Sequence, residues 1–345
     1  MGQARQRIDW IDYLRGLAII AVVGNHLWGY AFTSLILRNL TAFSVSLFIL
    51  LSGYTSAMAI ERSGNYFRYA EKRLVHILLP YLLVSIFYQL ATSPYPLSLK
   101  LFLVNIFTFS ANPVLYFVFV YLQLTLVAPF IVRLAKNSSL SRAILCLTTV
   151  FILGFAINHY FSFNSIFLPE NKTIGGVYIN GFVLGADKLL GGSYLFLFVL
   201  GIYLRTSDIV NKLEAKKGLL LFGSILGTAL IFGLKHEDMW SNPPNIWLIG
   251  YTLLVFSAVF SFVKMKIKYM DILFAGLRLF GRNSLYIFLL HPAFIKLATD
   301  LTGHLQGGSQ LAYWLLALVG PILVCWFLGK VLNKLTSQNG FLKFR

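Results

Sequence analysis

The residues best suited to chemistry lie together in one apolar segment near the N-terminus. The segment reads DWIDYLRGLAIIAVVGNHLWGY and contains Asp12, Arg15, Asn25 and His26. In a helix, the eleven steps along the chain from Arg15 to His26 make about three turns, or about 16 Å along the axis, and leave the two side chains about 20° apart. Asp12 shares that face. A neutral imidazole in this position is suited to removing a proton from a hydroxyl group.

Structural roles are open for the same residues. Arg15 in a membrane helix can extend to the inner headgroups, and a buried His26 can serve only to hydrogen-bond a neighbouring helix. Asp12 lies too far along the helix to touch His26, and we expect it to orient Arg15 instead. Ionisable groups inside a membrane span are costly, however, and a functional role is the first hypothesis to test for each.

The elements that carry these residues are predicted to be membrane helices. Hydrophobic residues make up 58% of the 345 residues, charged residues 12%, and the mean hydropathy is +0.74. These values exclude an ordinary soluble domain. Apolar runs of roughly 17 to 25 residues recur along the chain, the length that a bilayer crossing requires. We predict an all-α integral membrane bundle forming one domain over residues 1–345, with no separate soluble domain.

About ten transmembrane helices are expected. We place them at residues 13–32, 42–60, 77–92, 114–134, 143–161, 192–204, 218–235, 246–263, 280–299 and 311–330. Because Pro80 interrupts the third span and the sixth is short, a broken or tilted helix is open for both. Residues 101–109 are expected to form an interfacial or re-entrant piece rather than a crossing. The polar stretches 162–191 and 236–245 are either a substrate entrance or plain connectors.

Basic residues predict the orientation. The net charge is +17, and most of the 29 Lys and Arg residues fall on one side if the N-terminus is cytoplasmic. This is the positive-inside pattern, which places both termini in the cytoplasm and makes a nucleic-acid partner an unnecessary explanation for the charge. The N-terminus lacks a cleavable signal pattern.

Several other chemistries find no support in the sequence. Cys146 and Cys325 both lie in apolar spans, so neither a disulfide framework nor a thiolate metal site is expected. His159, His236 and His304 lack the spacing of a zinc site, and we predict no metal. No Ser-His-Asp arrangement and no glycine-rich phosphate loop is present.

Four segments, in order, resemble the acyltransferase-3 family over almost the full chain. DYLRGLAIIAVVGNH is similar to its first helix, whose signature is an Arg and a His separated by ten residues, here Arg15 and His26. SLFILLSGY is similar to the FF-x-x-SG stretch of its second helix, and KRLVHILLPYLL to its Arg-x-x-Arg and proline-tyrosine segment. GRNSLYIFLLHPAF is similar to the closing pattern, through Gly281, Ser284 and His291.

The chain also departs from the family pattern. His76 replaces the second Arg of Arg-x-x-Arg, which weakens a cationic clamp or makes it pH-dependent. The stretch Phe48-Ile49-Leu50 keeps one of the two usual aromatic residues, and Tyr116 takes the place of a common Trp.

The resemblance implies a membrane O-acyltransferase that moves an acetyl or succinyl group from cytoplasmic acyl-CoA to a hydroxyl of a cell-surface or exported polysaccharide. It implies His26 and Arg15 as catalytic residues, and acyl-CoA as a donor substrate rather than a bound cofactor. The cations expected to bind the donor are Arg68, Lys72, Arg73 and His76, although lipid-headgroup anchoring explains Arg68 and Lys72 equally simply. The residues assigned to substrate contact or to structure are Asp12, Ser52, Tyr54, Tyr286 and His291.

The implied surroundings are the cytoplasmic membrane of a bacterium, a glycan acceptor, and polysaccharide synthesis or export machinery. Two other functions compete with this one. A transporter or flippase for polysaccharide or lipid-linked glycan also lines its path with polar groups, but it tends to have corresponding broken helices in its two halves. A sensory or scaffold membrane domain does not require Arg15 and His26 to share a face.

Overall fold

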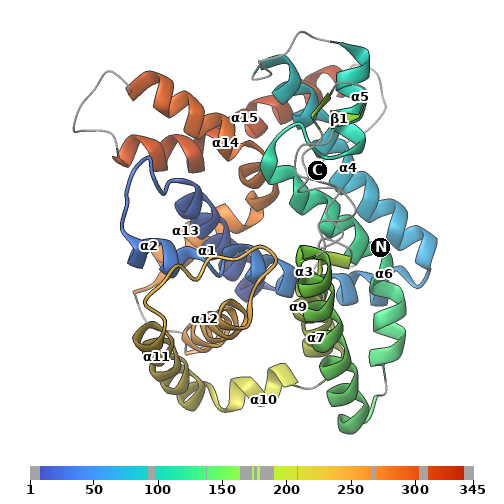
Figure 1. Ribbon diagram of the computed structural model, residues 1–345, viewed down its shortest axis with the longest axis vertical. Helices are drawn as coiled ribbons and strands as arrows, with labels where there is room; N and C mark the ends of the chain where they lie inside the picture. The colour runs from blue at the N-terminus through green and yellow to red at the C-terminus, as the bar shows by residue number, and fades with distance from the viewer. Residues whose placement is uncertain are drawn as a thin grey trace. The chain divides into compact units, whose positions relative to one another are not determined.

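The structure, a computed structural model, is helical in the part of the chain that it describes (Figure 1). The described residues are 8–91, 98–136, 138–163, 173–174, 177–178, 190–207, 209–265, 267, 269–302 and 310–337. The exception to helix is a short antiparallel hairpin of β1 (Thr173–Ile174) and β2 (Val177–Tyr178). The chain divides into two compact units, one from Phe43–Lys268 and one that joins Met1–Ala42 to Tyr269–Arg345.

The first unit combines the two ends of the chain. Its helices are α1 (Asp9–His26), α2 (Leu35–Thr41), α13 (Asp271–Arg282), α14 (Ser284–Thr302) and α15 (Gln310–Ser337). The second unit holds the middle of the chain. Its helices are α3 (Ser44–Ser63), α4 (Tyr66–Ala91), α5 (Leu99–Phe107), η1 (Pro113–Leu115), α6 (Tyr116–Ala135), α7 (Leu140–Phe163), α9 (Tyr194–Thr206), α10 (Ile209–Ala215), α11 (Lys217–Leu234) and α12 (Ile246–Lys264).

Glycines bring α1 and α13 into backbone contact in the first unit. A Cβ atom on Gly16 would lie 1.9 Å from the carbonyl oxygen of Leu277, and one on Gly281 would lie 1.9 Å from that of Asp12. Small residues at such positions let membrane helices approach closely enough to gain dispersion contacts along their backbones. The aliphatic residues of α1, such as Leu14 and Ile19, are accordingly buried.

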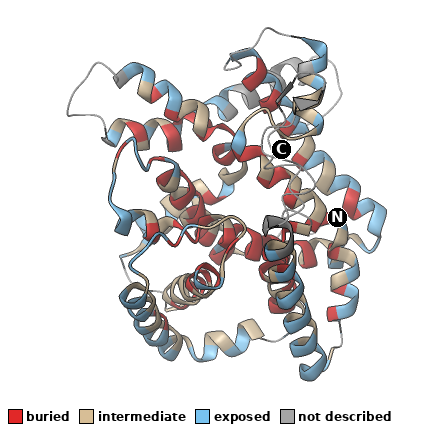
Figure 2. Ribbon diagram, in the orientation of Figure 1, coloured by how far each residue is buried: buried red, intermediate tan, exposed pale blue. Residues whose placement is uncertain are grey.

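Glycines likewise bring α3 and α9 into backbone contact in the second unit. A Cβ atom on Gly53 would lie 2.0 Å from the carbonyl oxygen of Phe198, and one on Gly201 would lie 2.0 Å from that of Leu50. Buried residues therefore concentrate along these two helices (Figure 2). Helix α3 ends at Ser63 and is followed by Gly64, whose φ of 65° is the left-handed conformation that glycine adopts without strain.

Exposed apolar side chains cover other helices of the second unit. Leu145 of α7 and Leu219, Phe222 and Leu226 of α11 are each at least 61% exposed. In Figure 2, α11 is drawn mostly in the colour of exposed residues. An apolar surface of this kind is costly in water and favourable in lipid. The burial pattern therefore agrees with the prediction of a helical membrane protein.

Seven helical segments of the described residues are long and apolar enough to cross a membrane, or up to eight if one bent pair is a single span. They are Leu35–Ser63, Tyr66–Ala91, Pro113–Ala135, Leu140–His159, Lys217–Leu234, Ile246–Lys264 and Ser284–Leu301. The other predicted spans are helical over most of their length, except that α1 ends at His26, so residues 27–32 of the first predicted span are not helical. Helix α1 carries Asp9, Asp12 and Arg15, and the apolar part of α15, Leu311–Val324, is short. The count of ten spans, the cytoplasmic termini and the single domain remain predictions.

The structure tests the local predictions for the third span, the sixth span and residues 101–109. Helix α4 continues through Pro80, so the third span is not broken. Over the sixth predicted span, residues 192–204, α9 is continuous, and the bend of 80° between α9 and α10 follows it, after Thr206. Helix α5 is too short to cross the membrane, in agreement with an interfacial or re-entrant piece. Most of the stretch 162–191 lies outside the described residues.

Candidate active site

Helix α1 carries both residues of the Arg and His signature. Asp9 and Asp12 occupy its first turn, where a carboxylate is favourable beside the positive end of the helix dipole. Arg15 is half-buried one turn later, and His26 is the last helical residue and is exposed. The two residues thus lie on one continuous helix, as the sequence predicted, with the imidazole at its accessible end.

Helix α14 places a second imidazole beside His26. The ring centroids of His26 and His291 are 4.8 Å apart, and the ring planes are inclined by 55°. The His291 side chain is completely buried, whereas His26 is exposed. His291 was expected either to line a cavity or to cap its helix, and its contact with His26 was not foreseen. Nothing in the spacing of the two residues along the chain indicates this contact.

The other end of α1 is paired with arginines of α13. Arg282 Nε donates to Asp12 Oδ2 at 3.4 Å, and Arg278 lies 3.3 Å from Asp9 Oδ2 and donates to the Tyr13 hydroxyl at 2.6 Å. The hydrogen bond with Tyr13 is the main cause that raises the pKa of Arg278. These pairs attach α13 to the first turns of α1 and complement its glycine contacts.

The arginines of α13 are functional candidates that the sequence reasoning missed, since it used them only as evidence of orientation. The signal that points to them is their spacing. Arg278 and Arg282 are four residues apart and therefore lie on one face of their helix, as Asp9 and Asp12, three residues apart, do on theirs. Two such faces can pair when the helices pack. Asp12 was predicted to orient Arg15; the structure pairs it with Arg282, and its influence on Arg15 remains a prediction.

Helix α4 bears the predicted donor-binding cations. Arg68, Lys72 and His76 are exposed and recur every four residues, so they form one stripe along the helix. Arg73 is half-buried beside this stripe, and its Nη2 donates to the carbonyl oxygen of Thr55 on α3 at 2.9 Å. We call Arg68, Lys72 and His76 the basic stripe. Exposed cations on a helix can bind phosphates with little rearrangement.

The remaining predicted residues have packing roles or exposed positions. Ser52 Oγ donates to the carbonyl oxygen of Phe48 at 2.7 Å, which occupies its hydroxyl within its own helix. Tyr54 is buried and hydrogen-bonds Arg205, which also forms a 2.7 Å ion pair with Glu61. Tyr286 is 37% exposed on α14. Tyr54 therefore connects α3 with α9, whereas the hydrogen bond of Ser52 stays within α3.

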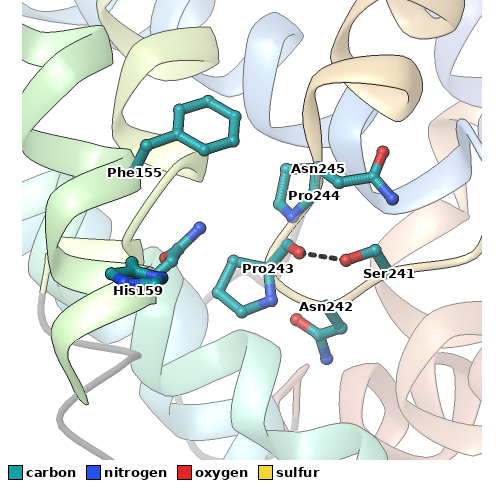
Figure 3. Close-up of a pocket in the computed structure, with 8 residues that line it drawn as sticks. Phe155, His159, Ser241, Asn242, Pro243, Pro244 and Asn245 are labelled. Atoms are coloured by element: carbon teal, nitrogen blue, oxygen red, sulfur yellow. Dashed lines mark hydrogen bonds between the residues drawn. The ribbon is translucent and has the colours of Figure 1, made fainter. Parts of the chain in front are cut away.

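A cavity of about 350 Å³ lies in the second unit beside the end of α7 (Figure 3). Asn158 and Ser193 hydrogen-bond one another at 2.8 Å, and Ser193 Oγ donates to the carbonyl oxygen of Pro244 at 2.6 Å. Ser241 Oγ donates to the carbonyl oxygen of Pro243 at 2.7 Å, and Asn245 Oδ1 caps α12. These groups hold the 241–245 loop, and we assign no ligand to the cavity.

In the described part of the chain, no three His, Cys, Asp or Glu side chains gather as a metal site would require. Cys146 is a free thiol. His304 and the side chain of Cys325 lie outside the description. The expectation that the protein uses no metal remains a prediction.

Sequence comparison connects this geometry with known proteins. The sequence model of an acyltransferase domain, that of the acyltransferase-3 family, matches residues 8–330. The chain belongs to the acyltransferase-3 family. The resemblance of the four motifs is thereby confirmed, and the matched region contains both His26 and His291. Family membership implies an acyl donor, and the apolar helices imply a lipid bilayer.

Curated relatives come from staphylococci. A protein of Staphylococcus aureus strain Mu50 is 25% identical over 313 residues, covering 86% of this chain and 81% of its own length. A protein of Staphylococcus epidermidis is 24% identical over 347 residues, covering 93% of this chain and 90% of its own length. Both are named probable poly-beta-1,6-N-acetyl-D-glucosamine export proteins.

Proposed function

We propose that the protein is a bacterial cytoplasmic-membrane O-acyltransferase. It transfers an acetyl or succinyl group from cytoplasmic acyl-CoA to a hydroxyl of an exported or cell-surface polysaccharide. The observation that carries the proposal is the position of His26, the exposed last residue of a helix whose middle is largely buried, in an acyltransferase-3 protein. The names of the staphylococcal relatives support a poly-N-acetylglucosamine acceptor.

In the proposed reaction, a ring nitrogen of His26 accepts the proton of the acceptor hydroxyl. The hydroxyl oxygen then forms a bond to the acyl carbonyl carbon, and the thioester C–S bond breaks. The departing coenzyme A thiolate receives the proton from the His26 imidazolium, which restores the neutral base. Direct transfer requires no nucleophilic side chain and no cofactor other than the donor.

Arg15 has a different task from His26. Because the two lie about three turns apart on α1, they cannot act on the same atom. We assign Arg15 to the phosphate-bearing part of acyl-CoA. Arg73 and the basic stripe of the second unit are proposed, independently of Arg15, as cations that attract acyl-CoA. A guanidinium binds phosphate through paired charge-assisted hydrogen bonds, which suits it to this role.

A second candidate function is export of the polysaccharide itself. The observation in its favour is the printed name of the relatives, which describes export rather than acylation. Export requires movement of the glycan across the bilayer and no consumption of acyl-CoA. The two functions therefore differ in whether an acyl group is incorporated into the glycan.

The test is transfer of radiolabelled acyl groups from acetyl-CoA and from succinyl-CoA into glycan by membranes containing the native protein, His26→Ala or His236→Ala at matched expression. His236 is exposed in the 235–245 loop and serves as the control. We expect label with the native protein and with His236→Ala, and its loss with His26→Ala. Absence of label with both donors, while glycan export still depends on the protein, would favour the exporter.

A further inference from the structure

Pro292 determines how the neighbouring His291 is bonded. Proline has no N–H group, so the carbonyl oxygen of Phe288, four residues earlier in α14, has no backbone donor at the usual helical position. His291 Nδ1 lies 2.7 Å from this oxygen and 3.2 Å from the carbonyl oxygen of Ile287. A carbonyl oxygen accepts and cannot donate. Nδ1 must therefore carry the hydrogen.

This bond leaves the other nitrogen of His291 as an acceptor. In a neutral imidazole with a protonated Nδ1, Nε2 carries a lone pair and no hydrogen. The side chain is fully buried, and Nε2 has no hydrogen-bond partner among the described residues. A buried acceptor without a donor is unfavourable and indicates a partner that takes up its position during function.

The His26 ring is the neighbour that can supply this donor. Two imidazoles joined by an in-line N–H···N hydrogen bond have centroids about 5 Å apart. The observed separation of 4.8 Å meets this condition, and the inclination of 55° leaves the bond to be completed by rotation of the exposed His26 ring. Catalytic hydrogen bonds are often misaligned without substrate and become linear when it binds.

We propose that His291 is a positioning residue that fixes the tautomer of His26. One ring nitrogen of His26 donates its hydrogen to His291 Nε2, and the other keeps its lone pair facing the acceptor hydroxyl. When that nitrogen accepts the hydroxyl proton, the hydrogen bond to Nε2 becomes charge-assisted and stabilises the imidazolium. The proposal rests on the assignment of His26 as the base and names the group that orients it.

Two substitutions separate this role from helix capping. His291→Asn places an amide nitrogen near the position of Nδ1, so it keeps the bond to Phe288 but lacks an acceptor near Nε2. His291→Gln places an amide oxygen near Nε2 and loses the capping donor. We expect His291→Asn to lower kcat for acyl transfer about 10- to 100-fold with KM for acyl-CoA unchanged, and His291→Gln to remain within about tenfold of the native kcat.

The reverse order, with His291→Asn active and His291→Gln inactive, would assign His291 to capping alone and overturn the proposal. Native activity in both variants would also overturn it. If both variants lose activity equally, the ¹⁵N NMR spectrum of His26 in histidine-labelled protein decides: a changed tautomer in His291→Asn supports the proposal and an unchanged one contradicts it. This spectrum needs no substrate. Failure of the native protein to transfer any acyl group would therefore refute the proposed function without deciding the histidine pair.

Discussion

The histidine pair and the basic stripe differ in how their side chains are held. His291 is buried and bonded to its own helix, and it lies against a helix that α13 holds through backbone contact and arginine pairs. Arg68, Lys72 and His76 are exposed along one face of α4. A group that moves a proton needs a fixed position, whereas groups that attract phosphates need mainly charge. The two regions therefore predict different responses to substitution.

Breaking the packed region should have the largest effect. Gly281→Ala places a methyl group on the backbone of Asp12, which cannot yield as a side chain would. We expect the substitution to destabilise the protein by about 3 kcal/mol or more and to remove most of the transfer activity. Thermal unfolding in detergent measures the change. Gly276→Ala on the same helix is the matched control, since a Cβ there meets nothing within 4 Å; equal stability of the two variants would contradict the packing.

The charged end of α1 should respond next. Arg15→Ala removes a guanidinium assigned to the donor phosphates, and we expect kcat/KM for acyl-CoA to fall about 100-fold, or about 2.7 kcal/mol of transition-state stabilisation. Arg15→Lys keeps the charge without the paired donors and should retain an intermediate rate. Steady-state kinetics at several acyl-CoA concentrations measures both. If kcat/KM for acyl-CoA in Arg15→Ala equalled the native value, Arg15 would have no role in donor binding and would be assigned to anchoring at the lipid headgroups.

The basic stripe should affect binding alone. In Arg68→Gln/Lys72→Gln we expect KM for acyl-CoA to rise about tenfold with kcat nearly unchanged, and the difference from the native protein to shrink at high salt because exposed charges are screened. The control is Lys212→Gln/Lys216→Gln, another exposed pair four residues apart. If Arg68→Gln/Lys72→Gln left KM for acyl-CoA unchanged but bound anionic lipid more weakly, the basic stripe would be assigned to contact with lipid headgroups.

Ser52 should show the smallest effect. Ser52→Ala removes a hydrogen bond within α3, and we expect a change in stability of about 1 kcal/mol or less and near-native transfer. Gly53→Ala, its neighbour, should be much more damaging because its Cβ would meet the backbone of Phe198. If a stable Ser52→Ala protein lost acyl transfer, Ser52 would instead have a role in substrate contact.

The sequence predicted what depends on local pattern. Hydropathy located the apolar helices, and the 3.6-residue period placed Arg15 and His26 on one helix, because both properties are read along a single segment. The motifs also gave the family. The contact of His26 with His291 and the pairing of Asp12 with Arg282 arise when distant helices pack, and no period encodes them. Ser52 was left open between substrate contact and a structural role, and its hydrogen bond to Phe48 within α3 favours the structural role without testing the other.

The most direct measurement is acyl transfer by the purified protein in proteoliposomes, with labelled acetyl-CoA or succinyl-CoA and a poly-N-acetylglucosamine acceptor. We expect label to become ester-linked to the glycan with the native protein, and His26→Ala to lower the rate by about 10² to 10⁴. An undiminished rate in His26→Ala would contradict the assignment of the base. No transfer from either donor would contradict the acyltransferase proposal itself.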